Sequence, residues 1–408
     1  MGRNIGQGER AAMYSANRLK LGLFGANCSS GRAVTLVPER WSGSWPDCLR
    51  LAQMADDAGI EFMLPIGRWK GYGGETDLHG ETLETITWAT GLLAATQNIT
   101  VFGTVHAPLF HPLIAAKEMV TADHIGEGRF GLNIVAGWNE GEFEMFGMEQ
   151  RPHDERYDFA QEWIDVVNRA WSDAEEQFDF DGRYFKLKGV RAKPKPYGGT
   201  RPLIMNAGHS GAGRDFAMRN CDAFFTSTGD VRLAAAGTAQ QISDEKLIEV
   251  TAQKVAAIKA EGEKFGRDIE VYTQGQVICR STQKEAEDFH HYANVENADW
   301  GAVERMLELR GVTPQNTPPA EYAAKRLQQA VSGIGGNPYV GTPDRVAEQL
   351  ANLSRGGVRG IAVSFVNYLN DAPFFCAEVL PRLAWMGLRA NRRHAAARPR
   401  GRAELAQC

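Results

Sequence analysis

The amino-acid sequence predicts one α/β domain folded as a (β/α)8 barrel, also called a TIM barrel. Two observations favour this fold over an open, doubly wound sheet. Eight short apolar segments recur along the 408 residues, and helical stretches follow them. The first segment is not followed by a Gly-x-Gly-x-x-Gly turn, and the chain has no Gly-Lys-Ser or Gly-Lys-Thr phosphate loop.

The eight expected strands are short, apolar and bounded by turn residues. They cover residues 19–25, 60–65, 99–104, 129–136, 202–206, 223–227, 269–279 and 360–366. Helices are expected at 46–58, 82–96, 112–125, 154–171 and 211–219, and a last helix ends at 388. Pro46 and Gly59 flank the first helix, at positions where proline and glycine usually begin and end helices.

Three segments fall outside this pattern. Residues 1–18 are polar, so we expect a flexible N-terminal arm before a barrel that covers 19–388. Residues 281–340 follow the seventh strand, are charged and contain proline and glycine, which predicts an insertion that acts as a lid. Residues 389–408 are basic and rich in alanine and proline, which predicts a disordered tail.

The composition excludes several classes of protein. A net charge of −5 gives no electrostatic reason to expect nucleic-acid binding, and no apolar run approaches the ~20 residues of a membrane span. The first residues lack the apolar centre of a signal peptide. The six cysteines include no Cys-x-x-Cys pair, which is typical of reduced thiols. We therefore expect a cytoplasmic protein that acts on a small molecule.

In a barrel of this kind the chemistry lies at the carboxyl ends of the strands. The residues expected there are mainly aromatic or neutral hydrogen-bonding groups, together with one arginine. They are Gly67, Arg68, Trp69, Thr104, His106, Asn133, Trp138, Ser210 and Gly211. Carboxylates are nearly missing from these strand ends, because Glu142 is expected in a loop and not at a strand end. The sequence also contains no nucleophile elbow. Such a set suits a site where a cofactor performs the difficult chemistry.

Three of these features have two interpretations each. Asn133 interrupts an apolar strand, and a buried amide needs hydrogen-bond partners, so it is either tied to the backbone or aimed at a heteroaromatic cofactor. The Gly/Ser-rich turn 207–213 either binds an anion at a helix N-terminus or only caps that helix. His106 either faces the substrate pocket or is a polar residue at the rim.

A metal site is a separate alternative, because barrel hydrolases bind metals at strand ends. The histidines near strand three and its neighbours are His79, His106, His111 and His124. Metal barrels usually need carboxylates or a close pair of histidines from one strand, whereas His106 and His111 are separated by a proline-containing loop. We therefore expect no metal site and keep a metal-dependent TIM-barrel hydrolase as the alternative function.

Several motifs together resemble the bacterial-luciferase-like flavin monooxygenases. They are 128–138 (GRFGLNIVAGW), Glu142, Phe146-Gly147, 153–157 (HDERY), 180–185 (FDGRYF) and 206–211 (NAGHSG). The resemblance covers residues 19–230 and 338–388. The most similar branches are the pyrimidine monooxygenase of uracil degradation, dimethylsulfone monooxygenase and dibenzothiophene-sulfone monooxygenase. The motifs are specific for the superfamily but not for a substrate.

The resemblance implies that FMN binds at the barrel mouth. By their positions, the matching cofactor-binding residues are Gly67, Arg68, Asn133, Glu142, Arg156, Tyr157, Ser210 and Gly211. Ser210 and Gly211 would hold the phosphate. Arg156 also has a simpler interpretation as a helix-surface ion pair, and Tyr157 as a core residue. Arg68 departs from the pyrimidine enzymes, which have lysine there, and the two cations are not interchangeable at a bidentate site.

The resemblance further implies a role for two candidate catalytic residues. Thr104 and Asn133 match the pair that, in the pyrimidine and sulfone branches, holds O2 beside flavin N5, so they would govern formation of a flavin-N5-oxygen adduct. A hydroxyl and an amide supply fixed donors without a titratable proton. Alone, Thr104 is equally an ordinary strand residue. His106, Trp69 and Trp138 would line the substrate pocket.

The predicted function is therefore that of a two-component FMN-dependent monooxygenase. Reduced FMN would come from a separate NAD(P)H-dependent flavin reductase by diffusion and would react with O2. The substrate would be an N-heterocyclic amide, a sulfone or a sulfonate. We also expect a homodimer or homotetramer. A closer alternative keeps the barrel but uses the deazaflavin F420 for hydride transfer.

Overall fold

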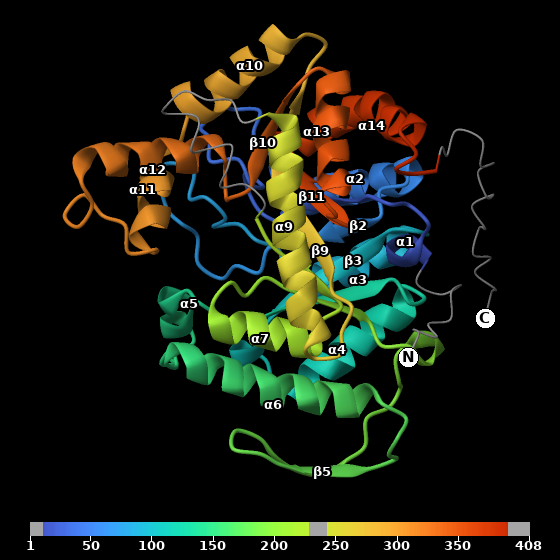
Figure 1. Ribbon diagram of the computed structural model, residues 1–408. Coiled ribbons are helices and arrows are strands. Elements are labelled where there is room, and N and C mark those ends of the chain that lie inside the picture. The colour runs from blue at the N-terminus through green and yellow to red at the C-terminus, as the bar shows by residue number, and fades with distance from the viewer. Residues whose placement is uncertain (1–10, 228–242, 391–408) are drawn as a thin grey trace.

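The computed structural model describes residues 11–227 and 243–390 (Figure 1). Eight parallel strands in these ranges form a closed barrel, because β11 pairs with both β1 and β9, and β8 pairs with β9. The strands are β1 (Lys20–Phe24), β2 (Phe62–Leu64), β3 (Thr100–His106), β4 (Phe130–Val135), β7 (Leu203–Asn206), β8 (Ala223–Phe225), β9 (Glu270–Cys279) and β11 (Gly360–Ser364). The predicted barrel and all eight predicted strands are confirmed.

Helices cover the outside of the barrel (Figure 1). The predicted ones are α2 (Trp45–Ala58), α3 (Thr85–Ala95), α4 (Pro112–Ile125), α6 (His153–Trp171), α7 (Gly211–Asn220) and α14 (Tyr368–Trp385), and α9 (Asp244–Glu263) and α13 (Pro343–Arg355) complete the layer. Gly59 ends α2 in the left-handed conformation, with φ of 81°, as expected of a glycine after a helix.

Besides α6 and a 3-10 turn (Tyr197–Gly199), a short helix and a hairpin lie between β4 and β7. One is a short helix, α5 (Glu140–Met145), in the segment that the sequence suggested was a loop. The other is a hairpin of β5 (Phe178–Asp181) and β6 (Lys186–Val190). Within the described residues, no helix combines the length and apolar character needed to cross a membrane.

Aromatic side chains fill the barrel near the first residues of its strands. The Phe62 ring packs edge-to-face on Phe102 and Tyr272, with ring centroids 6.0 and 5.8 Å apart. The short helix α1 (Ala11–Tyr14) adds Met13 to the same apolar cluster. This end of the barrel is closed by packing, which leaves the carboxyl ends of the strands for a site.

Parts of the two terminal segments contact the barrel, while the expected flexible arm and disordered tail stay predictions. Lys20 Nζ donates to Ser15 Oγ at 2.6 Å, and Arg389 lies 3.4 Å from the Glu61 carboxylate. Lys20 and Glu61 are buried charged groups that require partners, and Ser15 and Arg389 supply them. These contacts hold both terminal segments against the end of the barrel that α1 covers. The rest of both predictions, over 1–10 and 391–408, lies outside the described residues.

The insertion after β9 is helical rather than irregular. It contains α10 (Gln283–His291), a π-helical turn (Tyr292–Glu296), α11 (Trp300–Glu308) and α12 (Pro319–Val331), and the chain then continues into β10 (Asn337–Gly341). Strand β10 pairs in parallel with the last half of β9, outside the barrel. Figure 1 shows α11 and α12 together at one side of the molecule.

Buried polar side chains attach this insertion to the loops after β1 and β2. Asp299 caps α11 by accepting from Ala302 N at 3.1 Å, and its other oxygen accepts from Thr76 N at 2.9 Å. Arg32 donates to the carbonyl of Gly335 at 2.6 Å. Because these loops surround the strand ends, the insertion forms one side of the barrel mouth.

Candidate functional site

Arg68, in the loop after β2, is part of a buried network. Its Nη1 donates to Glu142 Oε1 at 3.0 Å and its Nη2 to the Tyr72 hydroxyl at 2.9 Å. The Trp69 backbone N–H donates to the same carboxylate at 2.8 Å. The Arg68 and Glu142 side chains are only 7% and 2% exposed. Helix α5 thus brings to the strand ends a carboxylate that the sequence placed in a loop.

His106 ends β3 beside this network, with its Nε2 3.8 Å from Glu142 Oε2. Burial lowers the pKa of His106 to about 4, although Glu142 acts in the opposite direction. Gly67 lies directly against it, because a Cβ on Gly67 would come within 2.8 Å of His106 Cε1 and 3.1 Å of Thr104 Cγ2. The imidazole is therefore neutral at pH 7 and enclosed by the β2 loop.

Thr104 and Asn133 lie opposite each other on neighbouring strands β3 and β4. The Thr104 hydroxyl donates to Pro65 O at 2.6 Å and accepts from Asn133 Nδ2 at 3.1 Å. A hydroxyl carries one proton, so in this arrangement the donor available to a ligand is the second N–H of the Asn133 amide. Asn133 is held by a side chain rather than by the backbone.

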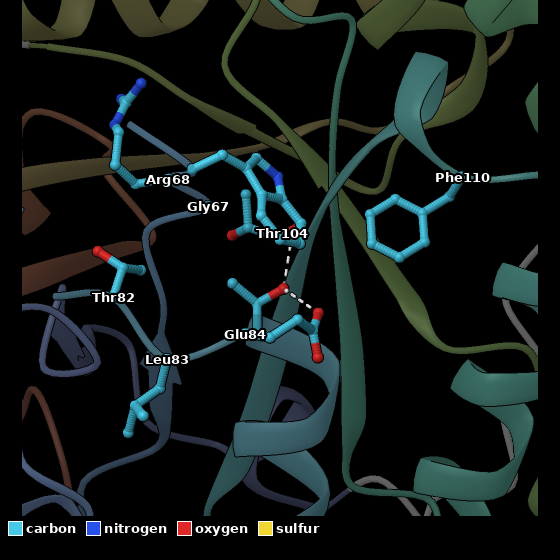
Figure 2. Close-up of a pocket in the computed structure, with 9 residues that line it drawn as sticks. Gly67, Arg68, Thr82, Leu83, Glu84, Thr104 and Phe110 are labelled. Carbon is cyan, nitrogen blue, oxygen red and sulfur yellow. Dashed lines mark hydrogen bonds between the residues drawn. The ribbon is translucent and has the colours of Figure 1, made fainter. Parts of the chain in front are cut away.

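A pocket opens where β2, β3 and the start of α3 meet. It is lined by Gly67, Arg68, Trp69, Thr82, Leu83, Glu84, Thr85, Thr104 and Phe110. Figure 2 shows the Phe110 ring extending towards Thr104 and Glu84, whereas the Arg68 side chain points away from them. The carboxylate of Glu84 accepts from Ile86 N at 2.9 Å and Thr87 N at 2.7 Å and so caps α3.

Partly exposed aromatic side chains lie in and beside this pocket. Trp69 is 36% exposed and packs edge-to-face on Phe146, with centroids 5.2 Å apart, and its centroid lies 6.5 Å from that of Phe110. Trp138 is 45% exposed, and the Arg68 guanidinium carbon lies 5.4 Å from its ring centroid. The predicted pocket residues Trp69, Trp138 and His106 are thus gathered around one end of the barrel.

The start of α7 forms a second part of the mouth. Ser210 caps the helix by accepting from Gly213 N at 3.2 Å, and a Cβ on Gly211 would meet no atom within 4 Å. A Cβ on Gly213 would come within 2.6 Å of the Tyr157 hydroxyl, so that hydroxyl lies at the same helix end. Backbone N–H groups, a helix dipole and a phenol together suit an anion such as phosphate.

Arg156, at the start of α6, connects the two parts of the mouth. Its Nη1 donates to the carbonyl of Gly137, in the loop after β4, at 2.7 Å. Its Nε is buried and has no hydrogen-bond partner among the described residues. Asn206, at the end of β7, shapes the neighbouring turn by donating to Ile134 O and accepting from Gly208 N, both at 2.7 Å.

The histidines do not form a metal site. The described residues contain no group of three or more His, Cys, Asp or Glu side chains placed to hold an ion. His79 is bonded to Gly31 O, and burial lowers its pKa to about 3. His111 caps α4, and His124 contacts Lys195 O at 2.8 Å. The metal-dependent hydrolase stays the alternative that the experiments below test.

The sequence-predicted residues fall into two groups. Gly67, Arg68, Glu142, Thr104, Asn133 and His106 form one, and Ser210, Gly211 and Tyr157 form the other. Three residues that line the pocket or contact the first group were not singled out from the sequence: Tyr72, Glu84 and Phe110. Phe146, which packs on Trp69, was part of a motif but was given no role. Phe110 had one available signal, since it follows His106 by four residues in the same strand-end loop.

A family model described as luciferase-like monooxygenase matches residues 22–360. An FMNH2-dependent dimethylsulfone monooxygenase of Pseudomonas fluorescens (strain Pf0-1) is 29% identical over 372 residues, which cover 90% of this chain and 95% of the relative. Pyrimidine monooxygenase RutA of Acinetobacter baylyi is 27% identical over 374 residues, 89% of this chain and 94% of that protein.

Comparison with solved structures gives the same fold. The structure of a riboflavin lyase with modified FMN and riboflavin matches with a TM-score of 0.79 at 22% identity and covers 91% of this chain and 93% of that chain. At this identity the match concerns the fold alone.

Proposed function

We propose that this chain, which belongs to the luciferase-like monooxygenase family, is the oxygenating component of a two-component FMN system. It takes reduced FMN from a separate NAD(P)H-dependent reductase and uses O2 to oxygenate a small organic molecule. The observation that carries this proposal is the family match over residues 22–360, which contains every residue of the site described above. The relatives named for FMNH2-dependent and pyrimidine oxygenation support it.

The residues at the start of α7 fit the phosphate of FMN. Gly211 leaves open space at the helix N-terminus, and the Tyr157 hydroxyl lies at the same end. The buried Nε of Arg156 lacks a partner, and a buried unpaired donor is costly unless a ligand satisfies it. Ser210, Gly211 and Tyr157 would hold the phosphate, and Arg156 would donate to the cofactor.

Reduced FMN, when bound, supplies the electrons that activate O2. The chain supplies a dry pocket and fixed hydrogen-bond donors. Asn133 keeps one N–H that its contact with Thr104 does not use, and we assign this donor to the cofactor and O2. Thr104 holds the amide in place, because its own proton is given to Pro65. His106 is neutral at pH 7, since burial lowers its pKa to about 4, so it does not deliver a proton from an imidazolium there.

The proposal also gives roles to the other site residues and to the insertion. Arg68, Glu142 and Gly67 shape the cofactor pocket, while Trp69, Trp138 and His106 face the substrate. The insertion over 281–340 covers the mouth and excludes water from it. The substrate is a small N-heterocyclic amide, sulfone or sulfonate, and the protein is a cytoplasmic homodimer or homotetramer.

The proposal is tested by combining the protein with an FMN reductase, NADH, FMN and O2 and a panel of these compounds. Substrate-dependent incorporation of one 18O atom from 18O2, detected by mass spectrometry, is expected. Treatment of the protein with EDTA should leave the activity unchanged. Loss of activity with EDTA, or alcohol oxidation with F420 in the absence of O2 uptake, would instead support the hydrolase or the F420 alternative.

A further inference from the structure

Aromatic side chains from three loops lie in or beside the pocket: Trp69 and Phe110 line it, Phe146 packs on Trp69, and Trp138 lies against Arg68. Trp69 follows β2, Phe110 follows β3, and Trp138 and Phe146 follow β4. Three of them are at least one third exposed: 36% for Trp69, 45% for Trp138 and 44% for Phe146. Large apolar groups that stay exposed side by side mark a binding surface more often than a folding requirement. The flat faces of such rings favour a flat partner.

The charges around the pocket disfavour an anion. Among the described residues that line it, Arg68 is the only cation. Its guanidinium is paired with Glu142 at 3.0 Å, and the side chain points away from Thr104 and Phe110 (Figure 2). The second charged group of the lining is the carboxylate of Glu84, which two backbone N–H groups hold in place. An anionic substrate would therefore meet a fixed negative charge and no unpaired cation.

We infer that the substrate of this enzyme is an electrically neutral, planar ring compound, and that sulfonates and other anions are excluded. The inference rests on the proposed function, because it assigns the substrate class of the same site. Trp69 and Phe110, whose rings are tilted by 44° to one another, both contact the ring. Glu84 provides the discrimination against negative charge. Trp69 and Glu84 are thus specificity-determining residues.

Three commercially available probes separate ring recognition from charge recognition. Benzamide and benzoate have the same ring and nearly the same shape but differ in charge, and acetamide has the amide without the ring. Equilibrium dialysis against the full-length protein, under anaerobic conditions with reduced FMN present, is expected to give a benzamide Kd at least tenfold below those of benzoate and acetamide. Equal or tighter binding of benzoate would overturn the inference.

Two substitutions assign the binding to this pocket. Trp69→Ala should raise the Kd of benzamide about tenfold, because one aromatic contact with its ring is lost. The Kd of acetamide, which has no ring, should not change. Glu84→Gln keeps a side-chain oxygen that can cap α3. Because it removes the negative charge, the difference between the Kd of benzoate and the Kd of benzamide should become several-fold smaller. Trp385→Ala is the matched control, since Trp385 is 79% exposed at the end of α14. If Trp69→Ala and Trp385→Ala bind benzamide alike, the pocket assignment is wrong.

A separate measurement distinguishes failure of this inference from failure of the proposed function. Oxidation of reduced FMN by O2 is followed with and without the protein, in the absence of any organic compound. If reduced FMN binds and is reoxidised on the protein but benzamide does not bind, only the substrate class is wrong. If reduced FMN does not bind, the proposed function itself fails.

Discussion

The two sides of the barrel mouth differ in how far their polar groups are already paired. On the side of β2, β3 and β4, Arg68 is paired with Glu142 through its Nη1 and with Tyr72 through its Nη2, so that only its Nε has no hydrogen-bond partner, and Thr104 is paired with Asn133. On the side of β7, the start of α7 has open space at Gly211, and the Nε of Arg156 is buried without a partner. The first side will be called the paired side and the second the open side.

This difference separates stability from ligand binding. Removing one member of a buried pair leaves the other uncompensated, so substitutions on the paired side should destabilise the fold or disturb chemistry. A donor without a partner is satisfied only when a ligand arrives, so substitutions on the open side should affect cofactor affinity and leave the free protein nearly as stable. Five predictions test this division.

The largest effect is expected for Asn133→Ala, which removes the N–H that the contact with Thr104 leaves unused and that we assign to the cofactor and O2. Product formation should fall about 100- to 1000-fold, as is typical for loss of such a donor, while O2 is still consumed and hydrogen peroxide accumulates. The measurement is the ratio of product to O2 consumed. In Thr104→Ala, product formation should fall only about tenfold, because Thr104 acts by holding the Asn133 amide in place. A coupled, fully active Asn133→Ala variant would contradict this role.

Glu142→Ala should lower the free energy of unfolding by about 3 kcal/mol, because Arg68 would remain buried without its partner. Urea unfolding followed by circular dichroism measures this. Glu140→Ala is the matched control, since Glu140 is exposed in the same helix α5 and should change stability by at most ~0.5 kcal/mol. A loss below about 1 kcal/mol for Glu142→Ala would mean that the pair does not stabilise the paired side.

His106 should make the protein less stable as the pH falls. Its pKa is about 4 when folded and ~6.5 when unfolded. The stabilising contribution is therefore complete above pH ~6.5 and is lost between 6.5 and 4, because only the unfolded state takes up the proton. Between pH 7 and 5 the wild type should lose about 2 kcal/mol more than His106→Gln. The exposed His153, replaced in the same way, serves as control, and identical pH slopes would refute the prediction.

Ser210→Glu tests the open side. A carboxylate at the start of α7 would occupy the proposed phosphate-binding position, so FMN binding should weaken about tenfold or more. Ser210→Asn is the control, because asparagine also caps helices and adds no charge. Isothermal titration with FMN gives the affinities, and urea unfolding should show nearly equal stability for all three proteins. Unchanged FMN affinity in Ser210→Glu would place the phosphate elsewhere.

The smallest effect concerns the insertion, which is attached to the paired side. Asp299→Asn keeps the volume but weakens the hydrogen bonds to Thr76 and Ala302, so limited proteolysis within 281–340 should become a few-fold faster. Reduced FMN and substrate should slow the cleavage of the wild type if the insertion closes over the mouth. Cleavage at the same rate with and without them would show that the insertion is a fixed wall and not a lid.

The sequence alone determined the barrel and the positions of most site residues. Apolar strands of three to ten residues and helices with proline at the start and glycine at the end are encoded by local spacing. Because strand ends converge in any such barrel, Thr104, Asn133 and Ser210 could be assigned to the mouth without coordinates. The insertion over 281–340 was predicted, but its helices were not, because each of them buries only a narrow apolar face and is charged on the outside.

Only the tertiary structure decided which of those residues pair with one another. The contact of Arg68 with Glu142 joins positions 74 residues apart, and that of Asp299 with Thr76 joins positions 223 apart. No local pattern encodes such contacts, because they depend on how the loops fold over the strand ends. For the same reason Glu142 was expected in a loop, although it lies in α5. Thr104 was expected to donate a hydrogen bond to the ligand, but its hydroxyl donates to Pro65 O, which leaves the Asn133 amide as the donor.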